Sequence, residues 1–216
     1  MTRTPSVRLL SVMLALALAA VALPPDAARG DGEVLSVKTE ALLVTDAAAA
    51  ARSDGIDVRV DRDSAGLEVE GRCRINASAS TAWDVLTDYD GIEKFVSSMK
   101  ESRVTRRDDD GILVDQMATG RMFLFTRRIR TTLRVHEEPP GRIRFEDVLG
   151  RDFKSYRGEW RIEKKRGAVE IVYRLRARPS FSMPDFVMRG LFRDTAHDLL
   201  AEVRTEIERR AALALR

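Results

Sequence analysis

Cysteine and histidine are nearly absent from this chain of 216 residues, which holds one cysteine, Cys73, and two histidines, His136 and His197. A single cysteine excludes an intramolecular disulfide, so the fold has to be held by its hydrophobic core. Two distant histidines and one cysteine give no metal-ligand spacing, and we expect no metal site. The sequence also lacks Gly-x-Ser-x-Gly, a phosphate-binding glycine loop and a dinucleotide fingerprint. We therefore predict no cofactor.

Long apolar runs are scarce, and the one at Leu9–Leu23 is fifteen residues long. The residues that flank it are Arg3 and Arg8 before it and the small residues Ala20, Val21, Ala22, Ala27 and Ala28 around its end. This pattern is typical of a secretory signal peptide. We predict a signal peptide over residues 1–22, with cleavage as late as residue 28, and a periplasmic or secreted product. A retained anchor is the alternative, although a spanning helix needs roughly 20 apolar residues.

Neither sign of charge is in large excess. The chain has 37 basic and 34 acidic residues, and removal of residues 1–22 with Arg3 and Arg8 leaves 35 against 34. The arginines of residues 121–134 and 174–178 alternate with apolar residues, as on the solvent face of a strand. We therefore predict no nucleic-acid partner, and contact with a membrane surface is left open.

Alternation of apolar and polar residues is abundant from Ile56 onward. Residues 31–55 contain the low-complexity stretch "DAAAAARSDG" and are interpreted as an N-terminal extension, whereas residues 56–216 form the predicted domain. The predicted strands are residues 56–60, 67–75, 103–107, 112–125, 128–136, 143–148, 156–163 and 169–176. A period of two over several short segments indicates antiparallel strands with one buried face.

Two kinds of helix interrupt this pattern. The segment Ala82–Val104 holds two apolar runs separated by the turn Asp88–Gly91, and each run is too short to be a stable helix alone. We interpret them as two short helices that close one end of a gap between sheet and helix. From Pro184 onward, apolar residues recur at intervals of three and four, which predicts one long amphipathic helix. They are Met188, Phe192, Ala196, Leu199, Val203 and Ile207.

The segment "INASASTAWDVLTDYDGIEKFVSSMKESRV" resembles the opening of START-like domains, the SRPBCC superfamily that includes polyketide cyclase/dehydrase and coenzyme Q-binding proteins. The segments "VDQMATGRMFLF", "EEPPGRIRFEDVLGRDFKSYRGEWRIEKK" and "VEIVYRLRARPSFSMPDFVMRGLF" are similar to later parts, in the same order, over roughly residues 66–211. The resemblance implies an α+β helix-grip fold, as in birch-pollen allergen. Its parts would be a curved antiparallel sheet of about six to seven strands, two short helices after the first strand and one long C-terminal helix.

The same resemblance implies a hydrophobic tunnel between sheet and helix, with the short helices at its mouth. The matching positions are Trp83, Tyr89 and Phe95 near the mouth, Met117 and Phe123 on a strand, and Met183, Phe186, Met188 and Phe192 at the start of the long helix. Ordinary core packing is the alternative for each of them.

Gln116 and Arg121 are the polar residues that could orient a ligand in such a tunnel. Because side chains alternate along a strand, Met117, Thr119 and Arg121 share one face and Gln116 the other, unless Gly120 marks a bulge. The alternative for Arg121 is the solvent-exposed arginine face.

The sequence and the resemblance together favour an exported, non-enzymatic, monomeric protein that binds a hydrophobic small molecule such as a lipid, an isoprenoid or a quinone. The alternatives are an aromatase/cyclase-type enzyme and a module that binds a protein partner or a membrane surface through the segment "SFSMPDFVMRGLF".

Overall fold

The computed structural model describes residues 54–122, 125–165 and 167–215, with the side chains of residues 121–126 excepted. The predicted signal peptide and nearly all of the predicted extension lie outside these residues. The described strands are β1 (Ile56–Asp63), β2 (Gly66–Ile75), β3 (Met99–Asp108), β4 (Gly111–Met122), β5 (Phe125–Glu138), β6 (Arg142–Asp147), β7 (Phe153–Lys165) and β8 (Ala168–Pro179). The helices are α2 (Ala79–Leu86), the 3-10 turn η1 (Ile92–Lys94) and α3 (Asp185–Ala214).

All eight strands belong to one antiparallel sheet with the order β1-β2-β8-β7-β6-β5-β4-β3. The curved sheet and the long C-terminal helix confirm the predicted helix-grip fold. The number of strands agrees with the eight ranges predicted from alternation and exceeds the six to seven that the resemblance implied. β1 and β3 are the two edges.

The two short helices lie between β2 and β3, so they follow the second described strand and not the first. α2 begins at its N-cap Ser78, whose Oγ accepts a hydrogen bond from the backbone N–H of Thr81, and such a cap stabilises a helix start by about 1 kcal/mol. The second predicted helix is a single 3-10 turn of three residues. With so little helix of their own, both depend on packing against the rest of the domain.

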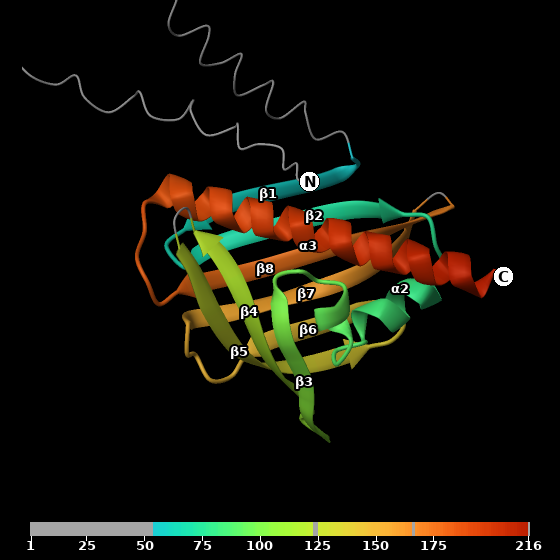
Figure 1. The fold of residues 1–216 in the computed structure, drawn as a ribbon, viewed down its shortest axis with the longest axis horizontal. Helices are drawn as coiled ribbons and strands as arrows, with labels where there is room; N and C mark the ends of the chain where they lie inside the picture. The colour runs from blue at the N-terminus through green and yellow to red at the C-terminus, as the bar shows by residue number, and fades with distance from the viewer. Residues whose placement is uncertain (1–53, 123–124, 166, 216) are drawn as a thin grey trace, which may run out of the picture. The chain divides into compact units, whose positions relative to one another are not determined.

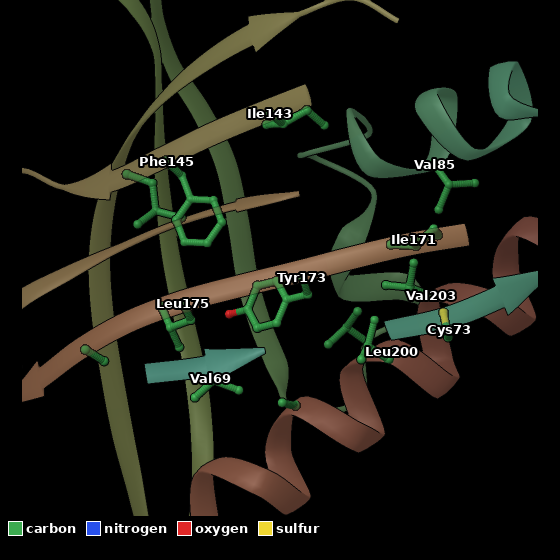
Figure 2. Close-up of a cluster of buried hydrophobic side chains, with 14 of the residues drawn as sticks. Val69, Cys73, Val85, Ile143, Phe145, Ile171, Tyr173, Leu175, Leu200 and Val203 are labelled. Atoms are coloured by element: carbon green, nitrogen blue, oxygen red, sulfur yellow. The ribbon is translucent and has the colours of Figure 1, made fainter. Parts of the chain in front are cut away.

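α3 lies along the β1–β2 side of the sheet, and α2 lies against it near its C-terminal end (Figure 1). Of the predicted apolar stripe, Met188, Ala196, Val203 and Ile207 are buried on its inner side and Phe192 and Leu199 are half-buried. Leu200, which the predicted stripe did not include, is fully buried. Figure 2 shows Leu200 and Val203 in a core that they share with Val69, Cys73, Val85, Ile143, Phe145, Ile171, Tyr173 and Leu175. Along the described residues, no helix combines the length and the hydropathy needed to span a membrane.

The opposite, convex face of the sheet carries paired charges. Arg174 Nε lies 2.8 Å from a carboxylate oxygen of Glu70, and Arg176 Nη2 lies 3.0 Å from one of Glu68. The hydrogen bond from Arg174 lowers the pKa of the Glu70 carboxyl. Arg174 and Arg176 of β8 therefore lie on the solvent face, as their alternation predicts, and acidic neighbours compensate their charge.

Candidate functional site

The concave face of the sheet is covered unevenly. On β8, the side chains of Ile171, Tyr173 and Leu175 are buried in the core. Their cross-strand partners on β7 share this face, and of these Ile162 and Trp160 are only half-buried. Since α3 packs against β1 and β2, the exposed part of the β7 side chains borders the space that α3 leaves uncovered.

The same incomplete cover continues across β5 and β4. Ile129 and Thr131 lie opposite Ala118 and Gln116 in the register of these strands, and all four are half-buried. Their face is that of Leu133 and Val114, which are buried in the core. The concave face of β4 to β7 is therefore mainly apolar and still accessible to a molecule that can reach it.

A slot of about 680 Å³ separates α3 from the β3–β4 edge of the sheet. One wall consists of Ser97, Ser98, Lys100, Thr119 and Gly120, and the α3 wall consists of Phe186, Val187, Gly190, Leu191, Asp194, Thr195, Asp198 and Glu202. Its volume falls within the roughly 300–1,000 Å³ that ligand pockets usually occupy.

Two glycines, Gly120 and Gly190, line the slot and place no side chain in it. A methyl group placed on Gly190 would meet no atom within 4 Å, and one on Gly120 would meet only Ile129 Cδ1 at 3.6 Å. A glycine inside a helix lowers stability by about 1 kcal/mol relative to alanine. The open space beside Gly190 is consistent with a role in keeping the slot free.

Few polar groups lie on the concave face. The charged Arg127 and Glu137 share this face of β5 and are bonded to Asp152 and Tyr89, whereas the polar groups near β3 and β4 are neutral. Gln116 Nε2 donates a hydrogen bond of 3.2 Å to the hydroxyl of the buried Ser102, whose own backbone N–H donates to Glu93 Oε2 at 3.3 Å. The amide oxygen of Gln116 stays available to accept a bond from a ligand. A neutral amide and a hydroxyl suit an alcohol or a carbonyl group better than an ion.

An aromatic cluster lies at the centre of the sheet. The ring of Phe145 lies 5.9 Å from that of Tyr156 and 6.3 Å from that of Tyr173, and Trp160 packs on Tyr173 at 4.5 Å. Burial raises the pKa of Tyr156 and of Tyr173. Both phenols are therefore neutral near pH 7 and can act only as hydrogen-bond donors or acceptors.

The connection of residues 88–98, between α2 and β3, is held by polar contacts to three elements. To β5, Tyr89 Oη donates a hydrogen bond to Glu137 Oε1 at 2.8 Å. With α3, Asp88 Oδ2 accepts from Arg210 Nη2 at 2.7 Å and Ser97 N donates to Glu202 Oε2 at 3.1 Å. With β3, Asp90 Oδ1 accepts from Val104 N at 2.7 Å. These bonds fix the connection to β5, α3 and β3. Burial, with the bond to Glu137, raises the pKa of the Tyr89 phenol.

Glu206 supports this end of the domain from within α3. Its carboxylate is buried and accepts 2.7 Å hydrogen bonds from Arg209 Nε and Arg210 Nε. The bond from Arg209 contributes most to lowering the pKa of this carboxyl from 4.5 to about 2. The charged carboxylate in turn holds Arg210 in place to bind Asp88.

Replacing Glu206 by glutamine is expected to reduce the free energy of unfolding at neutral pH by about 1–3 kcal/mol. Because the folded state lowers this pKa, the stabilisation is complete above pH 4.5 and is lost as the pH falls towards about 2. Urea unfolding at about pH 7 and about pH 3 should therefore show a difference between wild type and E206Q that shrinks in acid. E146Q is the control, since Glu146 is exposed and has no ion pair within the described residues. An equal loss at both pH values would contradict this account.

The structure separates the sequence-predicted site residues into two groups. Trp83, Tyr89 and Phe95 lie near the C-terminal half of α3, where Tyr89 is buried and the other two are half-buried. The guanidinium of Arg210 lies 5.8 Å from the centre of the Phe95 ring. Phe186 and Arg210 are about 36 Å apart along α3 at 1.5 Å per residue. The two groups therefore do not surround one opening.

The second group lies around the start of α3. Met188 is buried in the core, Met183 and Phe192 are half-buried against it, and Phe186 is 73% exposed beside the slot. On β4, Gln116 lies on the concave face, whereas Met117 lies on the other face opposite Arg130. The side chains of Arg121 and Phe123 lie outside those described.

Several residues of the site were missed by sequence reasoning. Tyr156, Gly158 and Trp160 alternate along β7, but in the sequence their alternation predicts only a strand over residues 156–163. The glycine at position 190 in a predicted helix was the one local sign of the slot, because it opposes helix formation. Ser97 and Ser98 carry no pattern that would have marked them. Within the described part of the chain, no three histidine, cysteine, aspartate or glutamate side chains gather as a metal site.

An antiparallel sheet that grips one long C-terminal helix and leaves part of its concave face open defines the class of START-like proteins, the SRPBCC superfamily. Within this class, the sequence pattern of the family described as polyketide cyclase / dehydrase and lipid transport matches residues 75–204. The chain belongs to this family. No curated protein sequence matches the chain.

Solved structures share the fold at low sequence identity. A STAR-related lipid transfer protein from Xanthomonas axonopodis is 19% identical with a TM-score of 0.57, over 72% of this chain and 94% of that chain. The ZhuI aromatase/cyclase from Streptomyces sp. R1128 is 16% identical with a TM-score of 0.56, over 66% and 94%. Human StAR-related lipid transfer protein 5 is 10% identical with a TM-score of 0.54, over 80% and 96%.

Proposed function

We propose that this protein is exported and binds a hydrophobic small molecule, such as a lipid, an isoprenoid or a quinone, on the concave face of β4 to β7. The observation that carries this proposal is the half-buried, mainly apolar part of that face, which α3 leaves uncovered next to the slot. Removing apolar surface from water contributes roughly 25 cal/mol per Å². Gln116 and Ser102 orient the polar end of the ligand.

The slot beside Gly190 serves as the entrance in this proposal. The connection of residues 88–98 is bonded to β3, β5 and α3, which argues against a gate made by the short helices. In the slot, the Ser97–Glu202 bond joins the two walls at one point, and Gly120 and Gly190 leave open space in the remaining lining.

Binding without catalysis fits the chemistry of the concave face. Tyr156 and Tyr173 have raised pKa values, so neither supplies a phenolate base near neutral pH. An aromatase/cyclase is the second function to consider, because Gln116 and Ser102 place polar groups on the same face and the chain shares its fold with such an enzyme. Recovery of an unaltered ligand favours the carrier, whereas conversion of a reactive polyketide chain favours the cyclase.

Native mass spectrometry of the protein, purified gently from its own compartment and followed by solvent extraction, tests the proposal directly. A stoichiometric lipid or quinone released intact supports binding, and its mass names the ligand class. The mass of the protein itself shows whether residues 1–22 have been removed, which tests export. A protein that is purified without a ligand and also fails to take up fluorescent fatty-acid and isoprenoid probes would contradict the proposal.

Variants at Gly190 test the entrance. Gly190→Trp is expected to fill the slot and weaken probe uptake on the order of tenfold to a hundredfold, which corresponds to about 1–3 kcal/mol, because the indole occupies the space that the probe has to cross. Gly190→Ala is the matched control, because its methyl group meets no atom within 4 Å, and it should raise helix stability by about 0.5–1 kcal/mol without changing uptake. Unchanged uptake in a folded Gly190→Trp protein would place the entrance elsewhere.

A further inference from the structure

Exposed apolar side chains gather at one end of the sheet. Leu149 and Val148 are 51% and 39% exposed in the β6–β7 connection, and Phe186, near the start of α3, is 73% exposed. The first residue of β7, Phe153, pairs with the last residue of β8, Pro179. The β6–β7 and β8–α3 connections therefore leave the sheet at the same end (Figure 1).

The two connections are also bonded to each other. Ser180 N donates to the backbone oxygen of Asp152 at 3.0 Å, and the Asp152 carboxylate accepts from Arg127 Nη2 at 3.0 Å. The guanidinium of Arg127 lies 4.5 Å from the centre of the Phe181 ring. This bonding orders both connections where they leave the sheet.

A local turn fixes the apolar tip of the β6–β7 connection. The side chain of Asp147 accepts hydrogen bonds from the backbone N–H groups of Leu149 at 3.3 Å and Gly150 at 3.1 Å. Gly150 has a φ of 61°, which favours glycine. An ordered turn thus keeps the side chains of Val148 and Leu149 exposed to solvent. Their exposed apolar surface does not stabilise the domain, which suggests an interaction site.

Basic residues outnumber unpaired carboxylates beside this tip. Arg151, Lys154 and Arg178 are exposed and have no ion pair among the described residues. Asp152 is paired with Arg127, and Asp185 with Arg62 and Arg189, whereas the Asp147 carboxylate is bonded to backbone N–H groups. Exposed apolar side chains next to uncompensated basic ones match an anionic bilayer, which takes up the former and attracts the latter.

We propose that this end of the domain, formed by Val148, Leu149, Arg151, Lys154, Arg178 and Phe186 and called here the end face, docks on the surface of a membrane that contains anionic lipids. A protein partner fits less well, because the basic residues of the end face are spread over the β6–β7 connection, the start of β7 and the end of β8. This inference goes beyond the proposed function, since docking would occur with or without a bound ligand.

Co-sedimentation with vesicles of phosphatidylcholine, with and without phosphatidylglycerol, tests the end face. We expect binding only with phosphatidylglycerol, weaker at high salt. Leu149→Ser should reduce binding about tenfold, and Arg151→Gln with Lys154→Gln should reduce it about fivefold for each charge. The controls are Leu213→Ser, a 53% exposed leucine at the far end of α3, and Arg103→Gln on β3. All variants contain residues 1–53, so any contribution of that segment to vesicle binding is the same in each comparison.

Equal vesicle binding by Leu149→Ser and Leu213→Ser would overturn the inference. So would a dimer that Leu149→Ser dissociates in the absence of vesicle binding, because the end face would then be a contact between copies of the chain. Probe uptake measured on the same variants separates this test from the proposed function. Leu149 does not line the slot, so its variant should keep normal uptake whichever way the vesicle result falls.

Discussion

Replacing Leu200 by alanine is expected to lower the free energy of unfolding by about 3–5 kcal/mol. Leu200 is fully buried, with 0% of its side chain exposed, where α3 meets the sheet. The variant loses both the transfer free energy of the removed atoms and the contacts around the cavity that remains. Thermal unfolding should show a midpoint lower by about 6–20 °C, given about 2–4 °C per kcal/mol for a domain of this size. Leu213→Ala, at an exposed position of the same helix, should change it little.

A second substitution shows whether Leu200 is the point of closest approach between α3 and β2. A methyl group on Gly71 would lie 2.5 Å from Leu200 Cδ1, so Gly71→Ala alone should destabilise by about 1–2 kcal/mol. In the Leu200→Ala background the methyl group enters the space that the leucine vacates, and its effect should vanish or change sign. Additive losses in the double variant would contradict this contact, because neighbouring residues should show coupling.

Replacing Gly158 by alanine is the second change with a large expected effect. Its methyl group would lie 2.6 Å from Phe145 Cζ and would also overlap the backbone oxygen of Arg174, which cannot rotate away. We expect a loss of about 3 kcal/mol and a midpoint lower by about 6–12 °C in thermal unfolding. Fluorescence or near-ultraviolet circular dichroism should change as well, because the Phe145, Tyr156 and Tyr173 rings are displaced.

Gly120→Ala is the matched control for Gly158→Ala. Gly120 also lies within a strand, but its methyl group would meet Ile129 Cδ1 at an ordinary 3.6 Å. Its stability should stay the same or rise by about 0.5 kcal/mol. If both variants lost similar stability, the effect would come from strand glycines in general and not from the packing of Phe145.

The fold followed from the sequence because one face of each strand is buried. In β2, Leu67, Val69 and Cys73 are buried and alternate with charged residues, so the period of two was unambiguous. α3 was also predicted, since Met188, Ala196, Val203 and Ile207 of the predicted stripe are buried. The length of η1 was misjudged, because a turn of three residues has too little periodicity to measure.

The site followed from the sequence only in part. β4 has apolar residues on both faces, so the pattern alone did not tell whether Gln116 or Met117 is concave, and the register with β5 decides it. The slot depends on how far α3 stands from β4, which no local pattern encodes. The sequence also did not show that Trp83, Tyr89 and Phe95 lie far from the start of α3, because periodicity says nothing about which end of a 30-residue helix a distant segment will meet.

The pairing of the last helix with the first strands has a consequence for how the chain acquires its structure. α3 packs on β1 and β2, and Asn76 and Ser97 bond to Glu208 and Glu202 more than a hundred residues later. Contacts over such separations form slowly, so the core cannot close until α3 is available. A nascent chain therefore keeps an incomplete core until α3 has been synthesised, even after all the described strands have emerged.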